Sequence, residues 1–309
     1  MNTPLHQRLL FLTALGAACA VGCARSSGTA VWTDQGEVAQ LRKALGEGAA
    51  GKADVAATAA EPAGFAMIRG TFKMEGAPPP RKILTVNKDQ DICMPGGKEA
   101  LSEELVVDAN GGIKDVVIYC ITKMPKDDPK WEHPDYAAAK TQPLIFDQKN
   151  CVFLTHMLVA RSSQTILLKN SDTKGHNANI VAKGKALSAN SLIPTGASSN
   201  YVPGGESPEP FDVTCSIHPW MSAKMLTRDN PIFAVTKADG SFEIKNVPAG
   251  VPLEFKVWQE SSKFIQTAKV NGTLAKWPKG KMTLKGKDML EPGKSLTLEV
   301  MVDATLFAK

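Results

Sequence analysis

The sequence predicts an all-β fold made of sandwiches, and three observations support this prediction. From Phe65 onward the chain is a series of short apolar or alternating runs, which Gly, Asn and Pro separate. Asp239-Gly240 lies between two alternating runs, which is a strong signal for a hairpin turn. No convincing amphipathic helix follows residue 63. Short strands with turn residues between them are typical of sandwiches, and 309 residues are enough for two or three such domains.

The N-terminus, residues 1–23, has the features of a signal peptide. Arg8 precedes a mainly apolar stretch, residues 9–21, which is too short to span a bilayer permanently. Cys23 and the small residues before it resemble the bacterial lipobox, which implies cleavage before Cys23 and a lipid anchor on that residue. The lipobox usually has Leu where this chain has Ala20, so ordinary secretory cleavage nearby is the alternative. Both alternatives predict an exported protein of the periplasm or cell envelope.

Residues 24–63 are rich in Ala, Gly, Ser and Thr, and they are predicted to form a flexible linker. A weak helical period at Val38, Leu41 and Leu45 allows at most one short helix there. A linker of this kind suits a domain that is held away from a membrane.

The strand-like runs fall into three segments, residues 64–145, 146–228 and 229–309. FAMIRGTFKMEG and ELVVDANGGIKDVVIYCI lie in the first segment, which also contains a predicted loop over 132–143. The second contains CVFLTHMLVA, QTILLKNSD, NIVAKG and FDVTCSI, and the third contains FAVTKADGSFEIKNVPAG, PLEFKVWQE and SLTLEVMVD.

The outer segments carry a family resemblance at their strands. IRGTFKMEGAPP and TKADGSFEIKNVPAGVPLEFKVW resemble strands of carboxypeptidase-regulatory-like or transthyretin-like sandwiches. The outer segments therefore form either one domain, with the central segment inserted, or two separate domains. The central segment is short for a complete eight-stranded sandwich, so its boundaries are approximate and it could include strands from the neighbouring segments.

The pattern that indicates chemistry is Cys215-x-x-His218-x-x-Met221, with His176 upstream at the end of a strand-like run. Copper that cycles between Cu(I) and Cu(II) needs ligands that suit both states. A thiolate, two imidazoles and a weak thioether supply such a set. The short loop can bring three of these ligands to one point, and the fourth must come from a distant strand.

The motif CSIHPWM, with His176-Asn177 upstream, resembles a cupredoxin with the short ligand loop of amicyanin. The resemblance covers roughly residues 146–228. It implies a type 1 (blue) copper site with His176, Cys215 and His218 as equatorial ligands and Met221 as the axial ligand. It also implies that Asn177 ties the two ligand loops together.

Other interpretations of the same residues remain open at this point. Cys215 could form a disulfide, or Cys215 and His218 could belong to a zinc site, although no second pair of zinc ligands is present. The chain could also store or deliver copper without redox turnover. A further alternative is a cell-surface interaction protein that uses its sandwiches for binding.

An electron carrier is favoured over an enzyme because all four ligand positions are filled by protein. In cupredoxins the edge of the second histidine emerges through an apolar patch where redox partners dock. The resemblance therefore implies that Pro219 and Trp220 form that patch, and that the partner is a cytochrome or a copper enzyme. Net charge is +5 without a run of like charge, so nucleic acid is not an expected partner. A membrane is expected only through the lipid anchor.

The remaining cysteines need a structural explanation in an oxidising compartment. Cys93 and Cys151 each have polar neighbours, and we predict a disulfide between them. Cys120 ends an apolar run and is predicted to be a buried free thiol. His156 lies in an alternating run and is predicted to be a hydrogen-bonded structural histidine.

Overall fold

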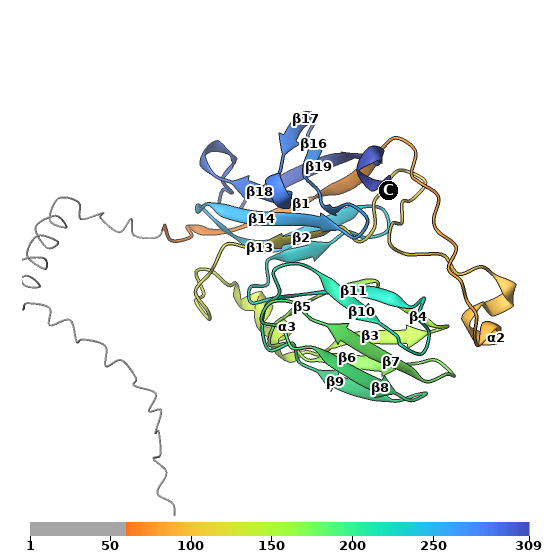
Figure 1. The fold of residues 1–309 in the computed structure, drawn as a ribbon. Helices are drawn as coiled ribbons and strands as arrows, with labels where there is room; N and C mark the ends of the chain where they lie inside the picture. Colours follow the sequence, from red (N-terminus) through yellow and green to blue (C-terminus); the bar gives the residue numbers. More distant parts are fainter. Residues whose placement is uncertain (1–59, 309) are drawn as a thin grey trace, which may run out of the picture. The chain divides into compact units, whose positions relative to one another are not determined.

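The computed structural model describes residues 60–308, so the signal peptide, Cys23 and most of the linker lie outside the described residues. Strands β1 to β19 make up most of the regular secondary structure of the described chain, and its helices are single turns or slightly longer (Figure 1). The predicted all-β sandwich fold is confirmed. None of the described helices is long and apolar enough to cross a membrane.

One sandwich combines strands from both ends of the described chain. Its first sheet has the order β13-β1-β19-β16-β17. The bounds of these strands are β1 (Gly64–Glu75), β13 (Ser241–Ala249), β16 (Thr267–Val270), β17 (Thr273–Lys276) and β19 (Ser295–Asp303). β1 lies between β13, to which it is antiparallel, and β19, to which it is parallel. The first and last strands of the described chain therefore form adjacent parts of one sheet.

The second sheet of this sandwich has the order β12-β2-β14-β15, and β18 also pairs with β14. Its strands are β2 (Val117–Cys120), β12 (Phe233–Val235), β14 (Leu253–Gln259), β15 (Lys263–Phe264) and β18 (Lys281–Leu284). One apolar core joins the two sheets and includes Ile68, Phe72 and Phe255, all nearly inaccessible to solvent. Both sheets therefore combine strands from the two outer segments.

The central segment forms the other sandwich. One sheet has the order β5-β11-β10-β7-β8 and the other the order β4-β3-β6-β9. The strands of the first sheet are β5 (Met157–Arg161), β7 (His176–Val181), β8 (Ala189–Ile193), β10 (Phe211–Thr214) and β11 (Ser222–Arg228). Those of the second are β3 (Leu144–Lys149), β4 (Val152–Phe153), β6 (Ile166–Asn170) and β9 (Ser198–Tyr201). Phe146, Leu168 and Phe211 are in the core between them.

A smaller apolar cluster lies between the sandwiches. Val117 and Tyr119 of β2 and Trp258 of β14 pack with Met157, Val159 and Leu226 of the central sandwich. The neighbouring residues of β2, Ile118 and Cys120, point into the core of the first sandwich. β2 is therefore buried on both faces, which explains why VIYC is continuously apolar.

Three local predictions differ from the structure. The predicted loop over 132–143 contains a short helix, α3 (Ala137–Thr141), because the alanine run has high helix propensity. CVFLTHMLVA is not one strand, since a bend separates β4 from β5. Asp239-Gly240 does form a turn, in which Gly240 has φ +78° and Lys237 N–H donates to Ser241 O. The strands on either side of the turn do not form the predicted hairpin, since β12 pairs with β2 and β13 pairs with β1.

Candidate metal centre

The four residues of the predicted copper site lie at one end of the central sandwich. His176 begins β7, and the loop from β10 to β11 carries Cys215, His218 and Met221. β10 pairs with β7 on one side and with β11 on the other, so the loop and the start of β7 come together. Inside the loop, Cys215 N–H donates to Met221 O and Met221 N–H donates to His218 O. These bonds hold the short loop in a closed turn.

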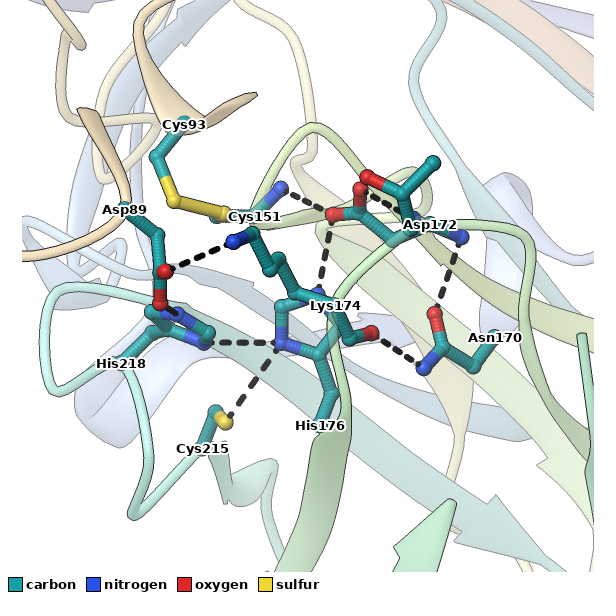
Figure 2. The surroundings of a disulfide bond; sticks show 10 residues. Asp89, Cys93, Cys151, Asn170, Asp172, Lys174, His176, Cys215 and His218 are labelled. Carbon is teal, nitrogen blue, oxygen red and sulfur yellow. Dashed lines mark hydrogen bonds and ion pairs between the residues drawn. A yellow bond between two sulfur atoms is a disulfide. The ribbon is translucent and has the colours of Figure 1, made fainter. Parts of the chain in front are cut away.

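Three donor atoms converge at this end of the sandwich. Nδ1 of His176 lies 2.9 Å from Nδ1 of His218 and 3.9 Å from Sγ of Cys215. Figure 2 shows the two imidazoles close together, with the thiol of Cys215 directed toward His176. Both histidine side chains are 0% exposed, and Cys215 is 1% exposed. The centre is therefore closed to bulk water.

The spacing of these atoms fits one metal ion. Protein ligands bind a transition metal at about 2.0–2.1 Å through nitrogen and about 2.3 Å through sulfur. Separations of 2.9 and 3.9 Å are each shorter than the sum of two such bonds, so one ion can reach His176 together with His218 or with Cys215. All three donor atoms lie within 4.8 Å of one another. A thiolate with two imidazoles is a donor set that copper accepts in both of its oxidation states. Met221, the fourth predicted ligand, is 2% exposed and packs in the same core.

Asn177 connects the two stretches that carry the donor atoms. Its Oδ1 accepts a 2.7 Å hydrogen bond from Ser216 N–H and lies 3.3 Å from Cys215 Sγ. Its Nδ2 donates to Asn190 Oδ1 on β8. The Asn177 side chain thus holds the ligand loop against β7. This is the role that the resemblance implied for Asn177.

Each histidine also contacts a carboxylate through its other ring nitrogen. Nε2 of His176 lies 2.9 Å from Asp172 Oδ2, and Nε2 of His218 lies 3.0 Å from Asp89 Oδ2 (Figure 2). Hydrogen bonds from His176 and from two backbone N–H groups lower the pKa of Asp172, against the effect of burial. Hydrogen bonds from His218 and Lys174 lower the pKa of Asp89. Both acids are therefore carboxylates that accept a ring N–H.

The pKa directions of the donor groups reflect burial and the contacts among these groups. Burial opposes charge on Cys215 and His176, but their contact lowers the pKa of the Cys215 thiol and raises the pKa of the His176 imidazole. Burial lowers the pKa of His218. At 2.9 Å, one of the facing Nδ1 atoms of His176 and His218 donates a proton to the other. A metal ion bound by both atoms would displace this proton.

A disulfide joins Cys93 to Cys151 beside this centre. Cys93 ends the short helix α2 (Gln90–Cys93), which belongs to a segment of the first sandwich that reaches over to the central one. The sulfurs of both cysteines and a ring nitrogen of His218 all lie within 4.8 Å of one another. Cys120 is free and buried in the core of the first sandwich, and burial raises the pKa of its thiol to about 11.

The predicted docking residues lie next to the centre. Pro219 is exposed and Trp220 is half-buried, with its ring centroid 5.2 Å from that of His218. The outer edge of His218 does not reach the surface, because Asp89 covers it. This differs from the exposed histidine edge that the resemblance implied.

Sequence reasoning missed the two carboxylates. Asp172 could have been found, since it precedes His176 by four residues within one loop. Asp89 could not, because 129 residues separate it from His218 and no local pattern links them.

His156 also contacts a residue that is distant in the sequence. Its Nε2 lies 2.5 Å from Glu260 Oε2, between the two sandwiches.

No protein-family model matches the chain, and no curated protein matches it in sequence. Several solved structures are similar to part of it. A reduced amicyanin variant shares 17% identity over 36% of this chain and 98% of its own, with a TM-score of 0.25. The purple cupredoxin from Nitrosopumilus maritimus shares 18% identity over 28% of this chain and 97% of its own, with a TM-score of 0.23.

A copper-containing nitrite reductase from Thermus scotoductus SA-01 shares 16% identity over 28% of this chain, with a TM-score of 0.26. The matched part spans only 22% of the nitrite reductase chain. The solved structures to which this chain bears such a likeness include cupredoxins.

Proposed function

We propose that this chain binds one copper ion in a type 1 site and carries single electrons as the ion alternates between Cu(II) and Cu(I). The observation that carries the proposal is the convergence of the His176 Nδ1, His218 Nδ1 and Cys215 Sγ atoms in a buried, closed site. His176, Cys215 and His218 would hold the ion, with Met221 as a weak axial ligand.

The bound ion would supply a one-electron couple, and the chain's own residues would keep its surroundings constant. Asn177 holds the ligand loop to β7, and the carboxylates of Asp89 and Asp172 hold the two imidazoles in fixed orientations. A site whose ligands are fixed in advance undergoes little rearrangement when its charge changes. Burial excludes water from the donor atoms, so the ion would meet no substrate there.

The same burial argues against the alternatives. A copper enzyme needs an open position for its substrate, and a delivery site needs access for exchange of the ion. The two histidines and Cys215 are at most 1% exposed, and protein atoms surround the donor atoms. An electron carrier needs neither kind of access, because electrons can cross several ångströms of packed protein.

The proposal also includes the cellular location of the protein and its redox partner. The signal-peptide pattern of residues 1–23 supports an exported protein of the periplasm or cell envelope, lipid-anchored if Cys23 is modified. A cytochrome or a copper enzyme would be the redox partner, and it would dock at Pro219 and Trp220 next to His218. Interfaces of this kind are small and short-lived.

Optical and EPR spectra of the copper-loaded protein test the proposal. The oxidised protein should show an intense thiolate-to-copper band that disappears on reduction and returns on oxidation. Cys215→Ser should abolish the band. Cys120→Ser, which removes the other buried free thiol, should keep it. A protein that binds copper without this band, or that binds zinc in its place after purification from its own compartment, would contradict the proposal.

A further inference from the structure

The two carboxylates at the metal centre reach it from different parts of the chain. Asp172 lies in the loop before β7 and belongs to the central sandwich. It accepts hydrogen bonds from Cys151 N–H and Thr173 N–H, and its own N–H donates to Asn170 Oδ1. Asp172 is 4% exposed. Its position is therefore fixed by the loops around it, which also position His176.

Asp89 comes from a segment that starts in the first sandwich. Residues 88–98, which we call the cap, contain α2 and lie against the ligand end of the central sandwich (Figure 2). The disulfide from Cys93 to Cys151 attaches the cap covalently to the loop between β3 and β4. The cap therefore cannot leave the centre while this bond is intact.

Three constraints fix Asp89 itself. Its backbone has φ +50°, a left-handed conformation that is costly for a residue other than glycine. Its carbonyl accepts hydrogen bonds from Ile92 N–H and Cys93 N–H, which start α2. Its two carboxylate oxygens bind different partners, since Oδ1 lies 3.0 Å from Lys174 Nζ and Oδ2 lies 3.0 Å from His218 Nε2.

We propose that Asp89 is a positioning residue of the metal centre, which the disulfide-held cap delivers to His218. This inference rests on the proposed copper site. By accepting the Nε2–H of His218, Asp89 fixes the tautomer in which Nδ1 is bare and free to bind a metal. Its negative charge, next to a ligand, also stabilises the more positive oxidised ion relative to the reduced one. The cap thereby holds the reduction potential low.

The experiment compares Asp89→Asn and Asp89→Ala with Asp91→Asn in the full chain. Asn keeps an oxygen acceptor but loses the charge, whereas Ala loses both. Asp91 is exposed on the same cap and makes no hydrogen bond to the centre among the described residues, so its variant is the matched control. Circular dichroism would verify that each variant is folded. The readouts are the imidazole ¹⁵N shifts of His218 in the copper-free protein and the reduction potential of the copper-loaded protein.

Removing the outer partner of a metal-bound histidine typically costs about 10- to 100-fold in metal affinity. If that loss falls on the oxidised ion, each tenfold corresponds to about 59 mV for a one-electron couple. Asp89→Ala should therefore raise the potential by at least that amount and mix the His218 tautomers. Asp89→Asn should raise the potential while it keeps the tautomer and the blue band. Asp91→Asn removes a charge that acts on Lys174 only at a distance, so it should keep the tautomer and change the potential much less.

The inference is overturned if the Asp89 variants match Asp91→Asn in potential and in tautomer. Failure of the copper proposal would look different, because the unchanged protein would then show no blue band at all. The ¹⁵N measurement needs no copper, so in that case it still decides whether Asp89 positions His218. A single tautomer that persists in Asp89→Ala would refute the role.

Discussion

The Nδ1 atoms of His176 and His218 lie 2.9 Å apart, and the Nε2 atom of each ring contacts a carboxylate. Two imidazoles that face each other in this way share at most one proton between them. The copper-free centre is therefore stabilised by the hydrogen bond that a metal ion would replace. This hydrogen bond allows a buried cluster of two histidines and a thiol to fold without a metal ion.

Asn177 should contribute measurably to the stability of the copper-free protein. Asn177→Ala removes the acceptor of Ser216 N–H and leaves that group without its partner in a half-buried loop. Loss of such a bond costs about 1–3 kcal/mol in the free energy of unfolding, which a denaturant titration would measure. Asn179→Ala, on the same strand, removes only a 3.3 Å bond to Thr214 and should cost less. Equal losses would mean that Asn177 does not hold the loop.

Trp220 should affect electron transfer between proteins and leave the copper spectrum unchanged. Its ring lies against His218 and is half-buried, so it offers apolar area next to the ligand. Trp220→Ala should slow electron self-exchange between oxidised and reduced copies by about tenfold, the effect of removing a moderate interface contact. NMR line broadening would measure this rate. Reduction by ascorbate, which needs no protein interface, should keep its rate, and an unchanged self-exchange rate would argue against a docking role.

Among single residues, those that belong to a sequence motif could be predicted as site residues. Cys215, His218 and Met221 are close in the chain, and His176 carries Asn177 as its neighbour, so chemistry and resemblance pointed to them together. Asp89 has no such neighbour. Its role depends on a cap that crosses from one sandwich to the other, and only the three-dimensional structure reveals that crossing.

Among the elements, β1 is the strand most constrained by its neighbours. Gly70 faces Leu298 in the parallel pairing of β1 with β19, and a Cβ at Gly70 would lie 1.9 Å from Leu298 O. Gly70→Ala should therefore push the two strands apart and lower the free energy of unfolding by about 1–3 kcal/mol, as over-packing in a core does. A denaturant titration would measure the loss.

Gly175→Ala is the control for this substitution, because no atom lies within 4 Å of a Cβ at that position. It should change the free energy of unfolding by only a few tenths of a kcal/mol. If both variants lost the same amount, close approach of the strands would not explain the effect at Gly70.

Strand positions were predicted well in the apolar or alternating runs that form β1, β14 and β19. Pairing was harder to predict. The turn at Asp239-Gly240 forms as expected, yet its two strands enter different sheets because their apolar faces meet different partners. Local sequence determines the turn, whereas burial across the whole sandwich determines the partner strand.

At the scale of the whole molecule, a charged group links the two sandwiches. Glu260, just after β14, contacts His156 and Lys224 of the central sandwich, the latter at 3.0 Å. Burial opposes ionisation of Glu260, but its hydrogen bond from His156 and the charge of Lys224 lower its pKa below the usual value. The lowered pKa means that the ionised group stabilises the folded state.

This linkage predicts a pH dependence. A carboxyl whose folded pKa is depressed stabilises the fold above its unfolded pKa of about 4.3. That contribution is lost as the pH falls through the folded pKa. Glu260→Gln should cost about 1.5–3 kcal/mol near neutral pH, and the difference from the unchanged protein should shrink in acid. Denaturant titrations of the copper-free protein between pH 3 and 7, as an approximate working range, would measure it.

Glu254→Gln serves as the matched control, since Glu254 lies on β14 and pairs at 2.9 Å with Lys281 in an exposed ion pair. An exposed pair contributes about 0–1 kcal/mol, so this variant should show little change at any pH. A Glu260→Gln variant whose deficit stayed constant in acid would show that ionisation of Glu260 does not contribute.

The parallel contact between β1 and β19 also affects the order in which the chain can assemble as it is synthesised. The ribosome releases β1 before the other described strands, but its parallel neighbour, Ser295–Asp303, emerges after all of them. The intervening strands from Leu144 to Arg228 emerge together and can assemble while β1 is still unpaired. A ribosome-stalled chain that lacks only β19 should therefore contain a protease-resistant ligand-bearing sandwich beside a protease-sensitive first one.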